Sequence, residues 1–168
     1  MSFQSWGLTE TEAEKLLTQI KSKDSDNYHH LQALAKKGDV IAEDRMGYLL
    51  AGNELGKPDY AAAMAWFEKA AKEGYALSES RLGYMYEQGI GVKKDMNLAL
   101  HWYELAAEHH NMAAAYNLGV DYQQGLGTGK DVKKAAYYFG LAAQEGQTDA
   151  MYNLGVMALD NKDYKEAK

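Results

Sequence analysis

The chain has 168 residues, of which 46% are apolar, so it can bury one core but has little room for a second independent domain. Its formal net charge of −6 repels phosphate backbones, which argues against a nucleic-acid partner. Cysteine is absent and no run of about 18 apolar residues occurs, so we expect no disulfide, no thiolate metal site, no cysteine nucleophile and no direct membrane insertion.

The first predicted element is a short helix that begins after Thr9. Thr9 and Glu12 have the spacing of a capping box, in which each side chain bonds the backbone amide of the other residue, and the helix is expected to end near Ile20. A second helix is expected over residues 28–37, whose apolar positions match those of later helices. We predict that residues 1–38 form an N-terminal helical cap with a degenerate half repeat.

From residue 39 onward the sequence repeats itself at an offset of 36 residues. Alanine pairs and aromatic pairs recur at this offset, and so does a residue pair that ends in glycine. The pairs that end in glycine are Met46-Gly47, Leu82-Gly83, Leu118-Gly119 and Leu154-Gly155. A fixed period of this length is typical of helical repeat proteins, in which each unit stacks on the next. The expected units are 39–74, 75–110, 111–146 and an incomplete fourth unit, 147–168.

Each unit is predicted to contain two antiparallel helices, termed helix A and helix B. Gly83 in helix A of the second unit removes a side chain and lets a neighbouring helix approach closely. A glycine loop such as residues 89–94 joins the two helices, and an aspartate such as Asp95 caps helix B. His110 stands where other units end in glycine, so we expect a strained turn there. The predicted fold class is therefore all-α.

The fourth unit departs from this pattern. No glycine loop follows Gly155, and residues 163–167 look like the start of a helix B that arrives about four residues early. Helix A would then keep an uncovered apolar side, which is a poor end for a helical array because terminal repeats normally carry a polar outer face. Two explanations stay open: the native chain continues beyond Lys168, or this face meets a partner or a second copy of the chain.

The combined pattern A-x-x-x-L-G-x-x-Y, G-x-G-V-x-K-D, A-x-x-W-Y-x-x-A-A resembles Sel1-like repeats, which are related to tetratricopeptide repeats. The match is most complete over residues 78–107 and extends over about residues 31–168. The resemblance implies a right-handed superhelix of antiparallel helix pairs whose concave face is lined by helix A of each unit. It also implies a scaffold or adaptor that binds a peptide or protein partner in that concave groove.

The candidate partner-binding residues are the helix A positions that the predicted core does not use. They are Asp44, Arg45, Tyr48, Ser80, Arg81, Tyr84, Glu87, Tyr116, Asn117, Val120, Gln123, Tyr152, Asn153 and Val156. Tyrosine supplies a large contact area, whereas arginine and asparagine supply directional hydrogen bonds to a peptide backbone or a carboxylate. The competing interpretation of Tyr48 and Tyr84 is that they pack on a neighbouring helix. We expect Arg45 and Arg81 to form surface ion pairs.

No catalytic residue, cofactor site or metal site is expected. Adjacent histidines, as in His29-His30 and His109-His110, point about 100 degrees apart on a helix and cannot clamp a metal ion together. The serines lack a G-x-S-x-G elbow, and the glycine loops lack the lysine and serine or threonine that end a phosphate-binding loop.

Two alternatives to a scaffold stay open because a fold does not fix a function. The family resemblance also suits an inhibitor or immunity protein that blocks a bacterial enzyme or toxin, and an enzyme that acts on cell-wall material. The absence of cysteine favours a cytoplasmic location, with an exported protein that has lost its signal sequence as the alternative.

Overall fold

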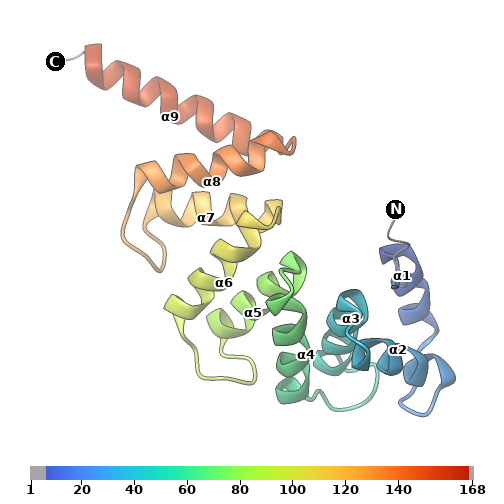
Figure 1. The fold of residues 1–168 in the computed structure, drawn as a ribbon. Coiled ribbons are helices and arrows are strands. Elements are labelled where there is room, and N and C mark those ends of the chain that lie inside the picture. Colours follow the sequence, from blue (N-terminus) through green and yellow to red (C-terminus); the bar gives the residue numbers. More distant parts are fainter. Residues whose placement is uncertain (1–6, 167–168) are drawn as a thin grey trace.

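The computed structural model describes the backbone of residues 7–166 and the side chains of residues 7–159. This part of the chain is helical, and its helices stack in sequence order into an open, curved array (Figure 1). The helices are α1 Glu10–Gln19, α2 Asp26–Lys36, α3 Val40–Ala51, α4 Tyr60–Lys72, α5 Ala76–Gln88, α6 Met96–Glu108, α7 Met112–Gln124, α8 Val132–Gln144 and α9 Thr148–Glu166. Residues 1–6 of the predicted cap and 167–168 of the predicted fourth unit lie outside the described residues.

The predicted helix pairs are confirmed. Helices α3 and α4, α5 and α6, and α7 and α8 are the A and B helices of three units, and α9 occupies the place of a fourth helix A. Asp95 caps α6 by accepting hydrogen bonds from the amides of Asn97 and Leu98, and Gly89 ends α5 in the left-handed region at φ 72°. His110 also adopts a positive φ, 67°, as its place in the repeat predicts.

An aromatic ring of helix B lies directly over the recurring helix A glycine in the first three units. A Cβ atom at Gly83 would lie 2.7 Å from the ring of Tyr103, and in the other two units the corresponding distance is 2.5 Å. The three pairs are Gly47 with Phe67, Gly83 with Tyr103, and Gly119 with Phe139. Glycine is therefore required at these positions by the packing of helix A against helix B.

The last helix differs from its prediction. We expected a new helix to begin within residues 163–167, but α9 continues without a break from Thr148 to Glu166. Residues 156–166 contain neither glycine nor proline, so the backbone has no residue that favours a helix end. The C-terminal part of α9 consequently runs out beyond the end of α8 (Figure 1), and nothing lies within 4 Å of a Cβ placed at Gly155.

A buried arginine of the first unit joins this unit to the N-terminal cap through ion pairs. The predicted capping box of Thr9 is present and begins α1. The side chain of Arg45 in α3 is only 5% exposed, and its Nη2 lies 3.2 Å from Oε1 of Glu14 and also contacts Glu10. Its Nη1 pairs with the adjacent Asp44. Helix α1 is thus held on the array by charge as well as by apolar packing.

The fully buried Asp44 extends this network to the second unit. Its carboxylate accepts hydrogen bonds from Ser78 Oγ at 2.7 Å and from Arg81 Nε at 3.1 Å, both in α5. The adjacent Glu43 is also buried, yet no ion pair or hydrogen bond to its carboxylate is formed within residues 7–159. Burial raises the pKa of Glu43; Lys69 opposes this effect, while nearby carboxylates add to it.

We expect Gly119→Ala to lower the free energy of unfolding by about 1–3 kcal/mol, because the new methyl group would overlap the ring of the fully buried Phe139. Gly140→Ala in α8 is the matched control. A Cβ there meets nothing within 4 Å, so this change should leave stability equal or raise it by roughly 0.5–1 kcal/mol. Urea unfolding of the two variants measures the difference. Equal stabilisation by both changes would contradict the packing role of the glycine.

We expect Glu43→Gln to stabilise the fold at neutral pH. The pKa of Glu43 in the folded chain lies above its ordinary value of 4.5, so its ionisation favours the unfolded chain. The gain in melting temperature over the parent chain should therefore be small near about pH 4 and grow as the pH rises to about 7. Asp44→Asn provides the contrast, because it leaves two arginines without their shared carboxylate and should cost about 3–5 kcal/mol. A lower melting temperature of Glu43→Gln at neutral pH would refute this assignment.

Candidate partner-binding groove

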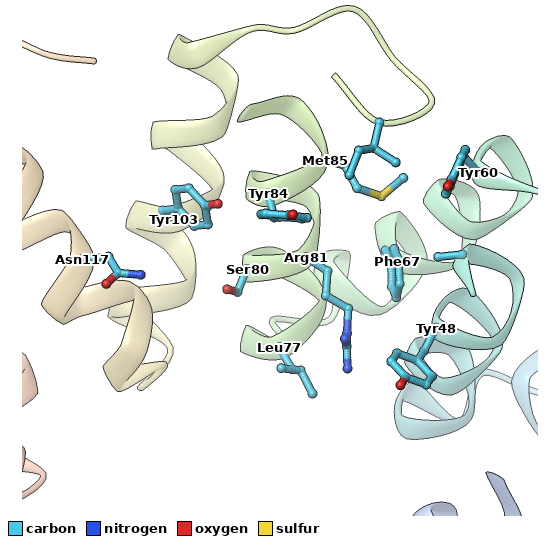
Figure 2. A pocket seen from close by; sticks show the side chains of 12 residues that line it. Tyr48, Tyr60, Phe67, Leu77, Ser80, Arg81, Tyr84, Met85, Tyr103 and Asn117 are labelled. Carbon is cyan, nitrogen blue, oxygen red and sulfur yellow. The ribbon is translucent and has the colours of Figure 1, made fainter. Parts of the chain in front are cut away.

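A groove of about 520 Å³ crosses the A helices of the first three units. Figure 2 shows the residues that line it on α3, α5 and α7, together with side chains from α4 and α6. Five of the candidate residues line this groove: Tyr48, Ser80, Arg81, Tyr84 and Asn117. Helix A positions at set distances from the recurring glycine therefore bring side chains from three different units to one groove.

The exposed part of the groove is aromatic. The side chains of Tyr48 and Tyr84 occupy equivalent positions one repeat apart and are 45% and 51% exposed. Neither ring is buried against a neighbouring helix, although this was the competing interpretation of both residues. Phe67 and Met85 lie deeper and give the groove an apolar floor. The groove thus combines a fixed apolar base with accessible tyrosine rings.

Two of the candidates do not reach the groove surface. Asp44 is fully buried, and the expectation that Arg45 forms a surface ion pair is wrong, because helix α1 covers its guanidinium group. The sequence pattern could not reveal this, since the covering carboxylates belong to the N-terminal cap rather than to a repeat. Partner binding by the remaining candidates stays a prediction.

The candidates of the third unit are partly used within the molecule. Tyr116 packs against Phe139 with ring centroids 5.7 Å apart, and its hydroxyl is 3.5 Å from Nδ2 of Asn153. Val120 is half-buried against the apolar core around Leu118 and Phe139, and Gln123 is also half-buried. This end of the candidate surface is less open than the first two units.

Two of the three candidates of the fourth unit, Tyr152 and Val156, line a separate apolar hollow on α9. Its volume is about 540 Å³, and its walls include Tyr152, Val156 and Leu159. Tyr152 is 72% exposed, the largest exposed fraction among the exposed large apolar side chains described. The structure therefore divides the candidate residues between a central groove and a C-terminal surface.

Residues from helix B and the loops also line the central groove. They were not among the predicted residues, because all of those lie on helix A. Tyr103 and Phe67 belong to the aromatic pairs that recur at the 36-residue offset, while Ile90 belongs to the loop after α5. The recurrence of the aromatic pairs was the available signal. It could not show that one edge of each ring faces the groove, because that depends on how adjacent units are rotated.

Acidic side chains lie close to the α6 and α7 side of the groove. The hydroxyl of Tyr103 donates a 2.7 Å hydrogen bond to Glu87 Oε2. Burial and this hydrogen bond raise the pKa of Tyr103, and burial together with Glu87 raises the pKa of Asp121. The Tyr103 hydroxyl therefore acts here as a hydrogen-bond donor to a carboxylate.

Within residues 7–159, no three histidine, aspartate or glutamate side chains converge as metal ligands. Among the helices that the structure describes, none combines the length and apolar character that a bilayer crossing requires. The geometry of the groove is suited to holding another molecule by surface contacts.

The sequence and the fold are similar to those of known repeat proteins. The Sel1 repeat pattern matches residues 40–75, 76–111, 113–147 and 148–167. A Sel1 repeat protein from Oxalobacter formigenes is 32% identical over 77% of this chain and 53% of that chain, with a TM-score of 0.68. The protective antigen c5321 of uropathogenic Escherichia coli, which has an SLR fold, is 26% identical over 78% of this chain and 28% of that chain, with a TM-score of 0.70.

A third solved structure supports the fold alone. The cysteine rich protein B of Helicobacter pylori is 22% identical over 84% of this chain and 96% of that chain, with a TM-score of 0.59. This chain spans about half of the length of the Oxalobacter protein and less than a third of c5321. No curated protein matches the sequence.

Sel1 repeats generally form scaffolds for protein interactions and are typically non-enzymatic. Each of the first three matched stretches contains one recurring glycine and the aromatic ring that covers it. The chain belongs to the Sel1 repeat family.

Proposed function

We propose that this chain is a scaffold that binds an extended segment of a partner protein in the groove formed by α3, α5 and α7. The observation that carries the proposal is the exposure of two tyrosine rings, Tyr48 and Tyr84, above an apolar floor. Tyrosine is enriched at the centres of protein interfaces because it offers a stiff apolar ring and a polar end.

Polar groups beside these rings suit the backbone of an extended segment. The side chains of Ser80 and Asn117 line the groove, and neither forms a side-chain hydrogen bond within residues 7–159. A hydroxyl and an amide together can donate to carbonyl groups and accept from amide groups. The groove is built on packed helices, so little conformational entropy would be lost when a partner binds.

We expect the double substitution Tyr48→Ala and Tyr84→Ala to reduce partner capture at least about tenfold, because an interface tyrosine that acts as a hot spot contributes about 2 kcal/mol or more. The melting temperature should change little, since both rings are largely exposed. The measurement compares the proteins that the immobilised parent chain and the double variant capture from the native cell, using quantitative mass spectrometry.

Tyr137→Ala is the matched control for this experiment. Tyr137 is 53% exposed, but it lies on α8 and does not line the groove. Capture should survive this change. Equal capture by the double variant would refute the groove as the binding surface, and the partner itself would separate a scaffold from an inhibitor that blocks an enzyme.

We also propose that the chain self-associates through α9. Gly155 lacks the aromatic cover that the other three helix A glycines have, and Tyr152 lies three residues away on the same face of the helix. Two copies of α9 packed antiparallel about a two-fold axis would place Tyr152 of each copy over Gly155 of the other. Such a contact would reproduce the ring-over-glycine packing found inside each of the first three units.

We expect the parent chain to dimerise with rising concentration and Val156→Glu to remain monomeric, because a carboxylate in this apolar hollow would lose its hydration. Sedimentation velocity between about 1 and 100 μM covers the relevant range of affinities. Tyr137→Glu on the exposed side of α8 is the control and should still dimerise. A parent chain that stays monomeric throughout this range would refute self-association.

A further inference from the structure

Arg81 holds a positive charge that the groove only partly neutralises. Asp44 carries a single negative charge and lies between two guanidinium groups, those of Arg45 and Arg81. Arg45 has two further carboxylate partners, Glu10 and Glu14 of α1. Arg81 forms no ion pair other than the one with Asp44 among residues 7–159. The two further carboxylates lie around Arg45, so Arg81, which lines the groove, has only a share of the Asp44 carboxylate.

The guanidinium group of Arg81 is also fixed in position. Its Nε donates to Asp44 Oδ1 at 3.1 Å, and its central carbon lies 5.1 Å from the ring centroid of Tyr48 and 5.7 Å from that of Phe67. Figure 2 shows this group beside the Tyr48 ring. Its two Nη nitrogens form no hydrogen bond within the described side chains, and the side chain is 26% exposed. Two parallel donors on a fixed plane match the two oxygens of a carboxylate.

Two hollows meet at this arginine. The larger groove of about 520 Å³ and a smaller hollow of about 170 Å³ share Tyr48 and Arg81 as lining residues. Both hollows are lined by Arg81, so a bound chain that occupies both places an internal residue beside this arginine. The geometry favours the side chain of an internal residue over a terminal carboxylate.

We infer that the groove recognises an extended partner segment in which one aspartate or glutamate side chain pairs with the Nη nitrogens of Arg81. An apolar neighbour of that residue lies over Tyr84 and Met85 in the larger groove. This inference rests on the proposed function and adds the chemistry of the segment. The site recognises the carboxylate group that aspartate and glutamate share.

The surrounding charges limit the segment to a single acidic side chain in the groove. Glu14 and Arg45 both line the smaller hollow and pair with each other at 3.2 Å. Glu87 lies beside the opposite side, where it accepts the hydrogen bond from Tyr103. Glu87 would repel a second acidic side chain placed near it, and Arg45 offers such a side chain little attraction because its guanidinium group already pairs with Glu10, Glu14 and Asp44. The segment should therefore carry one acid between apolar or neutral residues, rather than a run of acids.

The test begins with selection of binders to the parent chain from a display library of random 12-residue peptides. The expected outcome is enrichment of one aspartate or glutamate next to an apolar residue among peptides that no longer bind the variant with Tyr48→Ala and Tyr84→Ala. A selected peptide is then synthesised with its acid and with the matching amide. The amide form should bind the parent chain at least about tenfold more weakly, because it loses a charge-assisted hydrogen-bond pair.

Arg81→Gln and Arg81→Lys complete the design. The acidic and amide peptides should bind Arg81→Gln equally, whereas Arg81→Lys should retain part of the preference because it keeps the charge and loses the paired donors. The comparison of two peptides on the unaltered parent chain remains informative even if Arg81→Gln unfolds. Melting temperatures identify such unfolding.

The outcomes separate this inference from the proposed function. Peptides that need Tyr48 and Tyr84 but show no preference for an acid, or prefer a basic residue, would overturn the role of Arg81 and leave the groove as a binding site. The absence of any peptide that depends on the two tyrosines would overturn both. An acidic preference that persists unchanged in a folded Arg81→Gln variant would also overturn the inference.

Discussion

The contact between a helix A glycine and a helix B aromatic ring sets the geometry on which the rest of the array depends. Because a ring takes the space that a side chain would fill, the two helices of a unit approach closely and with a fixed rotation about their axes. Three consecutive units share this contact, so their A helices present equivalent positions at regular spacing. Tyr48 and Tyr84 lie on one side of the array for this reason, and a groove can form between units.

Charge distinguishes the first two units from the later ones. The buried network around Asp44 ties the cap, the first unit and the second unit together, while the second core cluster around Leu118 and Phe139 is built from apolar and small residues. Burying an ion network costs desolvation free energy, and the network stabilises the fold only when each of its members is paired. Here the pairing is uneven, since Arg81 keeps two donors that no described side chain uses. A structural network and a candidate recognition site therefore share one arginine.

The two ends of the array are covered differently. Helix α1 packs over the first unit and neutralises Arg45, whereas the far face of α9 exposes Tyr152 and leaves Gly155 uncovered. Exposed apolar area of this kind is a common feature of interaction surfaces. Binding in the central groove and self-association through α9 use separate residues, so the two proposals can be tested independently.

The sequence by itself determined the all-helical fold, the period of 36 residues, the helix limits set by Asp95 and Gly89, and the positive φ of His110. These features follow from local chemistry that repeats along the chain. It also identified five residues of the groove, because equivalent positions of a regular array must share a face. The tertiary structure alone decided that Asp44 and Arg45 are buried, that Tyr103 and Ile90 line the groove, and that α9 continues to Glu166. The first two outcomes depend on contacts between segments far apart in the sequence, which a repeating pattern does not encode, and the third on a stretch without a helix-breaking residue.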